Sequence, residues 1–324
     1  MKSNQQIIGQ LQRQRIVKQL QRELSHWDPD KQCEVHYYLS KNKRCQYDQF
    51  GRVIELHLCE CDLTQIPSEV WQFSSLKNLH LNNNQLNTVP EQVGRLSSLE
   101  WLELDDNLLS ALPEQVWNLH NLRFLDLANN QFRSLPMEIG NLTALRSLYL
   151  GNNQFSSLPE QVWSLSKLEV LDLSRNQLSS LPVAIGNLSL LRSLRLDNNQ
   201  LSSLPVAIGN LTALRSLLLG NNQFSTFPIE IIKLSDLRML RLSHNQLGSL
   251  PGEIGNLSEL GMLFLQNNQL SSLPMELGNL SSLKRLHLDG NPLQTPPLKI
   301  IAQGTQAILA YLRTMQEAKR LEAI

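Results

Sequence analysis

Leucines are spaced along the chain in a pattern that fixes their distance from one asparagine. The pattern, L-x-x-L-x-L-x-x-N-x-L, is seen at Leu168, Leu171, Leu173, Asn176 and Leu178. The asparagine returns every 23 residues, at Asn84, Asn107, Asn130, Asn153, Asn176, Asn199, Asn222, Asn245, Asn268 and Asn291. A catalytic residue is needed once, whereas a residue that returns at a constant interval is expected to support a repeating backbone.

Eleven copies of this pattern follow one another without insertion or deletion. They begin at residues 53, 76, 99, 122, 145, 168, 191, 214, 237, 260 and 283. The first copy is degenerate, because Cys61 stands where the other copies have asparagine. The pattern divides the chain into an N-terminal helical cap (1–52), the repeats (53–296) and a C-terminal helical cap (297–324).

Each copy predicts a short strand followed by a turn and a short helical stretch. The L-x-L segment alternates, which places its leucines on one face of a strand. Such strands can bury their leucines only by stacking about 4.8 Å apart in a parallel sheet. In the outer half, Leu181, Ile185 and Leu188 are spaced for the helical stretch, Pro182 presets φ, and Gly186 is expected to allow unusual backbone angles. Because outer segments are wider than strands, we expect a curved α/β solenoid with the sheet on its concave side.

The asparagine is predicted to satisfy backbone groups where the chain leaves the strand. Those groups have no ladder partner, and an amide side chain can both donate and accept hydrogen bonds. Stacked copies should therefore form a ladder of asparagines.

The frame, together with the closing "LPxxIGxL", resembles the leucine-rich repeat family. It is most similar to intracellular arrays of the Ras-scaffold, plant Ras-group and Roco types and to bacterial relatives. The resemblance implies a horseshoe solenoid and a non-catalytic protein–protein interaction module, a scaffold or signalling adaptor. It also leaves two alternatives: the recognition part of a larger enzyme assembly of the Roco GTPase or ubiquitin-ligase type, or a secreted pattern-recognition protein.

Both ends are expected to carry caps, because a solenoid exposes core at its ends. Residues 5–24 have roughly helical apolar spacing. Residues 305–321 are predicted to form a helix with Thr305 as its N-cap. The residues of this helix expected to cover the last leucines are Ile308, Leu309, Leu312 and Met315.

The segment before the first repeat resembles the N-terminal cap of plant-receptor leucine-rich repeats. Trp27, Cys33, Cys45 and the run "GRVIEL" carry this resemblance. The two cysteines are usually bridged in those caps, so the resemblance implies a Cys33–Cys45 disulfide. Because the repeats are not of the receptor variant, free thiols stay an alternative.

Composition and charge argue against a membrane-spanning protein and against a nucleic-acid-binding one. The chain has no net charge and 41% hydrophobic residues, and no run of apolar residues is long enough to span a membrane. Its start lacks the compact apolar run of a secretory signal, so we expect a cytoplasmic protein. Residues 1–52 carry ten lysines and arginines against five acids, a net charge of +5, which is too mild to demand nucleic acid.

No catalytic motif is present, and neither enzymatic activity nor a cofactor is expected. The sequence has no phosphate-binding glycine loop, no H-E-x-x-H and no nucleophile elbow. The spacing is not that of paired C-x₂-C knuckles, and the C-x-C pair is expected to point both side chains the same way, so we expect no metal. The one cluster with zinc-ligand chemistry is Cys33, His36, Cys45, His57, Cys59 and Cys61.

The variable positions around L-x-L are predicted to face a protein partner. Trp101, Phe124 and Tyr149 should be neighbours on successive strands. The acids predicted to surround them are Glu100, Glu103, Asp105, Asp106 and Asp126. Exposed aromatic residues ringed by acids suit a basic segment with an apolar anchor.

Further along, the same face is predicted to be basic and apolar. Arg195, Arg238 and Arg241 should lie near Leu218, Met239, Met262 and Phe264, and Asp172 stands in the same column of variable positions. A solvated face with charges of both signs is the simpler alternative for this region.

Overall fold

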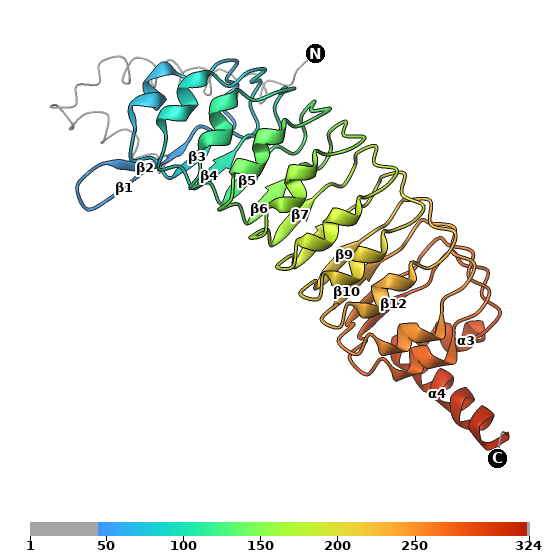
Figure 1. Ribbon diagram of the computed structural model, residues 1–324. Coiled ribbons are helices and arrows are strands. Elements are labelled where there is room, and N and C mark those ends of the chain that lie inside the picture. Colours follow the sequence, from blue (N-terminus) through green and yellow to red (C-terminus); the bar gives the residue numbers. More distant parts are fainter. Residues whose placement is uncertain (1–44, 323–324) are drawn as a thin grey trace, which may run out of the picture. The chain divides into compact units, whose positions relative to one another are not determined.

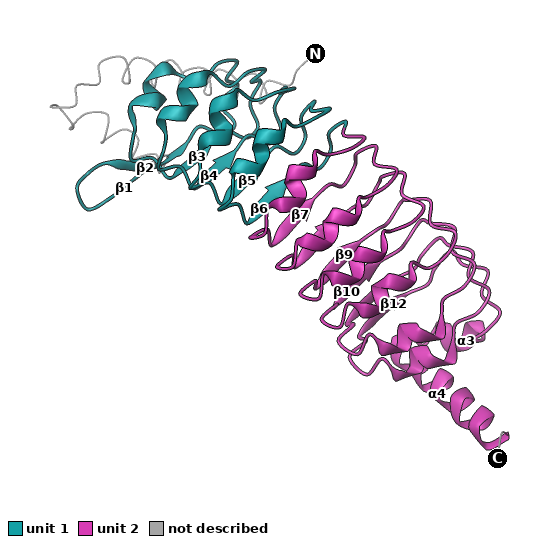
Figure 2. Ribbon diagram, viewed as in Figure 1, with its two compact units in different colours: residues 1–154 teal, residues 155–324 magenta. Residues whose placement is uncertain are grey.

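The computed structural model describes residues 45–322, and its contacts divide the chain into two compact units (Figures 1 and 2). Unit 1 ends at Gln154 and unit 2 begins at Phe155. The predicted helical cap at residues 5–24 and the Cys33–Cys45 disulfide lie outside the described residues.

Unit 1 contains six strands in chain order in one sheet. These are β1 (Cys45–Tyr47), β2 (Val53–His57), β3 (Asn78–His80), β4 (Trp101–Glu103), β5 (Phe124–Asp126) and β6 (Ser147–Tyr149). From β2 onward the strands are parallel, and equivalent repeat positions pair. The helical stretches are the 3₁₀ helices η1 (Ser68–Gln72), η2 (Glu91–Arg95), η3 (Glu114–Asn118) and η4 (Met137–Asn141).

The first strand departs from the predicted parallel sheet. β1 lies in the segment predicted to form the helical cap (1–52) and pairs antiparallel with β2, the strand of the first repeat, so the sheet begins with a hairpin. The Asp48 carboxylate accepts hydrogen bonds from the backbone N–H groups of Phe50 and Arg52, and Gly51 takes a positive φ of 75°. A turn of this kind depends on local hydrogen bonds and not on the repeat. The spacing of leucines therefore does not predict the hairpin.

Unit 2 contains six parallel strands and continues the same repeat. The strands are β7 (Val170–Asp172), β8 (Ser193–Arg195), β9 (Ser216–Leu218), β10 (Met239–Arg241), β11 (Met262–Phe264) and β12 (Arg285–His287). The helices are η5 (Glu160–Ser164), η6 (Val183–Asn187), η7 (Val206–Asn210), η8 (Ile229–Lys233), η9 (Gly252–Asn256), η10 (Met275–Asn279), α3 (Leu298–Ile301) and α4 (Thr305–Glu322).

Each coil buries the leucines of its strand against the apolar residue of its 3₁₀ helix. Leu171, Leu173 and Ile185 have no exposed surface. Pro182 precedes η6 with φ −75° and ψ 159°, an extended geometry that the proline ring favours. These five-residue helices are too short for several i→i+4 bonds, so they stay 3₁₀.

Gly186 is needed for close approach and not for an unusual φ. A Cβ atom at this position would lie 2.8 Å from the backbone oxygen of Ala207 in the next coil. The expectation of special backbone angles at Gly186 is therefore wrong: the glycine lets neighbouring helices come together.

The unusual angles occur instead one residue before the ladder asparagine. Asn198 has a φ of 57°, and Arg175 and His244, at the same repeat position, have φ values of 54° and 55°. Asparagine tolerates the left-handed region better than most residues, which explains why the chain so often reads "NN".

The asparagine ladder is confirmed. Asn199 accepts from the N–H of Leu178 in the preceding coil at 3.0 Å. Its amide donates to the carbonyls of Leu173, in that coil, and Leu196, in its own, at 2.9 and 3.1 Å. Asn199 is buried, and each such side chain joins two adjacent coils.

The C-terminal cap is a helix, but Thr305 does not act as predicted. α4 begins at Thr305, whose hydroxyl accepts from the backbone N–H of Leu286 on the last strand at 3.0 Å. The hydroxyl thus provides a hydrogen-bond acceptor for one backbone N–H of the last strand. The spacing of residues in the sequence does not predict this contact. Ile308, Leu309 and Leu312 are buried as predicted, whereas Met315, one turn further along α4, is exposed.

Replacing a ladder asparagine should destabilise the protein. Asn199→Ala leaves buried backbone groups without partners and should lower the free energy of unfolding by ~1–3 kcal/mol. Urea unfolding followed by circular dichroism measures the change. The control is Asn187→Ala at an exposed position of η6, and equal stability of the two variants would contradict the role of the ladder.

Candidate functional site

The strand face of unit 1, defined as the side chains flanking each central leucine of β2–β6, carries an aromatic stack. The rings of Trp101 and Phe124 lie parallel with centroids 3.6 Å apart, and Tyr149 is tilted against Phe124 at 5.3 Å. Register pairing of Trp101 with Phe124, and of Asp126 with Tyr149, produces this arrangement. The predicted contiguity of the three aromatic residues is confirmed. Trp101 is 36% exposed, so the stack is open to solvent.

The acids around the stack differ in how far their charge is compensated. Glu100 forms ion pairs with Lys77 at 3.0 Å and Arg123 at 3.6 Å. Glu103 accepts from the indole N–H of Trp101 at 2.8 Å and contacts His80 Nδ1 at 2.6 Å. These contacts fix Glu100 and Glu103 in place and offset part of their charge.

Among these acids, Asp105 is the one whose negative charge is least stabilised by its surroundings. Burial, together with the negative charges of Asp106 and Glu103, raises the pKa of Asp105 to about 6. Burial alone would also raise the pKa of Glu103, but the hydrogen bonds from His80 and Trp101 outweigh it, so that pKa is lowered. Negative charge is therefore crowded beside the aromatic stack.

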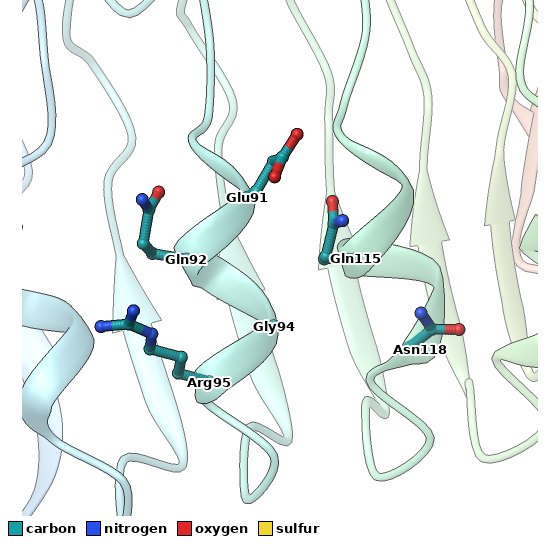
Figure 3. Close-up of a pocket in the computed structure, with 6 residues that line it drawn as sticks. All are labelled: Glu91, Gln92, Gly94, Arg95, Gln115 and Asn118. Carbon is teal, nitrogen blue, oxygen red and sulfur yellow. The ribbon is translucent and has the colours of Figure 1, made fainter.

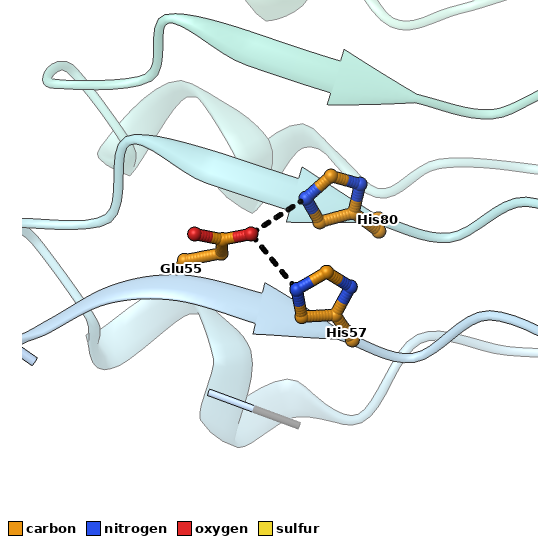
Figure 4. Close-up of side chains that lie close together, drawn as sticks. All are labelled: Glu55, His57 and His80. Atoms are coloured by element: carbon orange, nitrogen blue, oxygen red, sulfur yellow. Dashed lines mark hydrogen bonds and ion pairs between the residues drawn. The ribbon is translucent and has the colours of Figure 1, made fainter. Parts of the chain in front are cut away.

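A cluster of two histidines and a carboxylate adjoins the stack (Figure 4). His57 Nε2 lies 2.8 Å from Glu55 Oε1, and His80 Nε2 lies 3.4 Å from the same oxygen. The two rings stack with centroids 4.1 Å apart. The sequence predicted His57 to lie in a cluster with His36 and four cysteines. His57 and His80 occupy the same repeat position on adjacent strands, and this spacing is the signal that points to their contact.

Cys59 and Cys61 form no disulfide and differ in their exposure. Cys61 is buried in its repeat position, whereas Cys59 is half-exposed. The expectation that the C-x-C pair points the same way is wrong, because Glu60 takes a left-handed φ of 55° and breaks the alternation. Cys61 Sγ donates to the carbonyl of Cys59 at 3.3 Å.

A shallow polar hollow of about 380 Å³ lies between η2 and η3 on the helical side of unit 1 (Figure 3). Gly94 contributes no side chain there, and a Cβ would lie 2.9 Å from Gln115 Cβ. Glu91 and Arg95 place opposite charges at its margin. In Figure 3 the labelled side chains do not converge on one point, so the hollow offers no focused set of ligands.

Two of the arginines on the strand face of unit 2 are paired. Arg195 lies 3.4 Å from Asp172, and Arg241 lies 3.8 Å from Asp197. The guanidinium of Arg241 also sits 5.3 Å from the ring centroid of Phe264. The predicted apolar surroundings are present, but the charges of Arg195 and Arg241 are partly compensated, whereas Arg238 is exposed.

Asp172 is not available at the surface. It was predicted to face a partner, yet it is buried, with 8% of its surface exposed. One carboxylate oxygen accepts from the backbone N–H and hydroxyl of Ser174, and the other lies near Arg195. The long arginine and the serine cover it.

Within the described part of the chain, no helix combines the length and apolar character needed to cross a membrane. The longest one, α4, is amphipathic and buries only the side that packs on the last repeat.

Removing the charge of Asp105 should stabilise the protein in a pH-dependent way. Its folded pKa of about 6 exceeds the unfolded value, so its contribution to stability falls as pH rises from about 4 through 6. After discounting for solvent, Asp105→Asn should gain about 1 kcal/mol at neutral pH and little near pH 4. Urea unfolding at both pH values measures this, with exposed Asp289→Asn as the control; a gain that does not change with pH would argue against burial as the cause.

Solved structures with the same architecture include bacterial and plant proteins. A leucine-rich repeat protein of Leptospira interrogans is 35% identical, with 75% of this chain and 74% of that chain covered and a TM-score of 0.58. The plant peptide hormone receptor RGFR1 in complex with RGF2 is 30% identical (71% and 42% covered, TM-score 0.60). The Arabidopsis receptor kinase HAESA, in complex with the peptide hormone IDA and the co-receptor SERK1, is 27% identical (87% and 54% covered, TM-score 0.64). The chain thus spans about half the length of these receptors.

Family models cover most of the described repeats. The model for a leucine-rich repeat region matches residues 45–143 and 114–217, and the leucine rich repeat model matches residues 191–247 and 235–293. No curated protein sequence matches the chain. The repeat frame, the asparagine ladder and these matches agree, and the chain belongs to the leucine-rich repeat family.

Proposed function

We propose that this protein is a non-catalytic interaction module that holds a basic peptide segment of a partner protein on the strand face of unit 1. Leucine-rich repeat proteins generally mediate protein–protein interaction. The single observation that carries the proposal is the exposed stack of Trp101 and Phe124 beside crowded carboxylates.

The chemistry of the stack fits a segment with an apolar anchor. Flat aromatic surfaces of this size provide large contact area at low entropic cost, and such residues dominate binding energy at interfaces. Parallel packing of Trp101 on Phe124 holds both rings in place before a partner arrives. The anchor would cover rings that are already ordered.

The charge distribution favours a cationic partner. Burial is the main cause of the raised pKa of Asp105, and repulsion by the negative charges of Asp106 and Glu103 raises it further. A lysine or arginine placed beside them would relieve this repulsion and keep Asp105 ionised. An acidic segment would increase it, so the same feature provides discrimination.

A peptide-like partner is also supported by the receptors to which the chain is similar. RGFR1 and HAESA were solved with the peptide hormones RGF2 and IDA. On the strand face of unit 2, Arg241 and Phe264 offer a second contact region, where compensated charge favours apolar contact over electrostatic attraction.

The proposal extends to a scaffold or signalling adaptor of the cytoplasm, in keeping with the intracellular repeat type that the frame resembles. A secreted recognition protein is the second candidate, favoured by the 30% identity to RGFR1. Mass analysis under non-reducing conditions separates the two, because a Cys33–Cys45 disulfide fits the secreted protein and free thiols fit the cytoplasmic one.

Substitutions in the aromatic stack and the acids around it should abolish the preference of the protein for basic peptides. Panning a random peptide library on the wild-type protein should enrich peptides that combine lysine or arginine with an aromatic or leucine anchor. Trp101→Ala combined with Asp126→Lys should weaken binding of these peptides by at least ~10-fold, about 1.4 kcal/mol, measured by fluorescence anisotropy.

The matched control truncates an apolar side chain on the helical side. Val183 on η6 is 73% exposed, and Val183→Ala should bind the selected peptides like the wild type. Enrichment of acidic peptides, or undiminished binding by the double variant, would refute the assignment of this surface.

A further inference from the structure

We propose that Glu55, His57 and His80 form a binding site for a divalent transition metal ion, best suited to zinc. The three side chains come from adjacent strands of unit 1: Glu55 and His57 are two residues apart on β2, and His80 pairs with His57 from β3. Their possible ligand atoms all lie within 4.8 Å of one another. Figure 4 shows the carboxylate of Glu55 directed between the two rings.

The hydrogen-bond pattern leaves a lone pair of His80 directed at the site. His80 Nδ1 lies 2.6 Å from the carboxylate of Glu103, an acceptor, so this nitrogen carries a proton. In the neutral ring Nε2 is then an acceptor. That atom is buried without a hydrogen-bond partner, although Glu55 Oε1 is 3.4 Å away. In the neutral ring two acceptors therefore face each other, and either a second proton on His80 or a metal ion between the two atoms compensates both.

A second layer of contacts matches that of known metal sites. Histidine ligands usually donate their other ring N–H to a carboxylate, which fixes the tautomer and the ring orientation. Glu103 is the carboxylate that contacts the other ring nitrogen of His80. The indole N–H of Trp101 donates a hydrogen bond to Glu103 Oε1 at 2.8 Å. The outer contacts are thus already formed.

The ligand chemistry and spacing suit zinc. Two imidazoles and one carboxylate are a common zinc set, and three protein ligands leave one position for water or for a partner. Ligands about 2.1 Å from a tetrahedral ion lie roughly 3.4 Å apart, which is the separation of His80 Nε2 and Glu55 Oε1. The ring of His57 must turn about its Cβ–Cγ bond to converge on the ion, and that torsion is soft. His80 keeps its orientation and its contact with Glu103.

Cobalt(II) and zinc titrations of the full chain test the site without any partner, so their outcome is independent of the proposed peptide binding. After treatment with a chelator and desalting, the wild-type protein should bind one equivalent of zinc in calorimetry. Cobalt(II) should give the visible bands of a low-coordinate nitrogen–oxygen site without a thiolate charge-transfer band. His80→Ala and Glu55→Gln should each lose this binding, and Glu103→Gln should weaken it about 10- to 100-fold.

His287→Ala is the matched control, because His287 occupies the same column of the repeat on β12. This variant should bind zinc like the wild type, and zinc should raise the melting temperature of both. Absence of stoichiometric binding by the wild type overturns the proposal. So does binding that persists in the folded Glu55→Gln and His80→Ala variants, or that brings a thiolate band, because the ion then sits on cysteines.

Discussion

The need to satisfy buried backbone groups where each coil leaves its strand governs the structure of both units. Without a partner, each such group would cost on the order of 1–3 kcal/mol, and every coil would repeat that cost. The ladder asparagine removes it by accepting from the preceding coil and donating to carbonyls of both coils, as Asn222 does with Leu201, Leu196 and Leu219. Leucine burial then adds stability to a backbone that is already satisfied.

The same constraint explains what the sequence could predict. Leucine spacing and the asparagine period identify the strands, the register, the ladder and the columns of the strand face, because these features repeat. The hairpin of β1, the exposed Met315 and the contact of Thr305 with Leu286 occur once, at the ends, where no periodicity reports on them. The role of Gly186 was misjudged because its constraint is a neighbour in space, the backbone of Ala207.

The candidate site was predictable in position but not in electrostatics. Columns in the sequence place Trp101 beside Phe124 and Arg195 beside Asp172, as the structure has them. Whether a charge is free depends on side-chain reach, however, and a long arginine covers and neutralises Asp172 while short side chains leave Asp105 half-buried among like charges. The strand face of unit 1 therefore carries crowded carboxylates beside the aromatic stack, whereas Arg195 and Arg241 of unit 2 are paired with Asp172 and Asp197.

Glu103 connects the two functions proposed for unit 1. Its carboxylate contacts the indole of Trp101 on one side and His80 on the other. A cation at Nε2 of His80 would draw that ring and Glu103 together, and Glu103 in turn sets the orientation of the indole that a partner would cover. Conversely, a partner pressing on Trp101 would restrain Glu103 and with it the tautomer of His80. Metal and partner would thus act on the same hydrogen-bonded chain, and by linkage each would change the affinity of the other by the same factor.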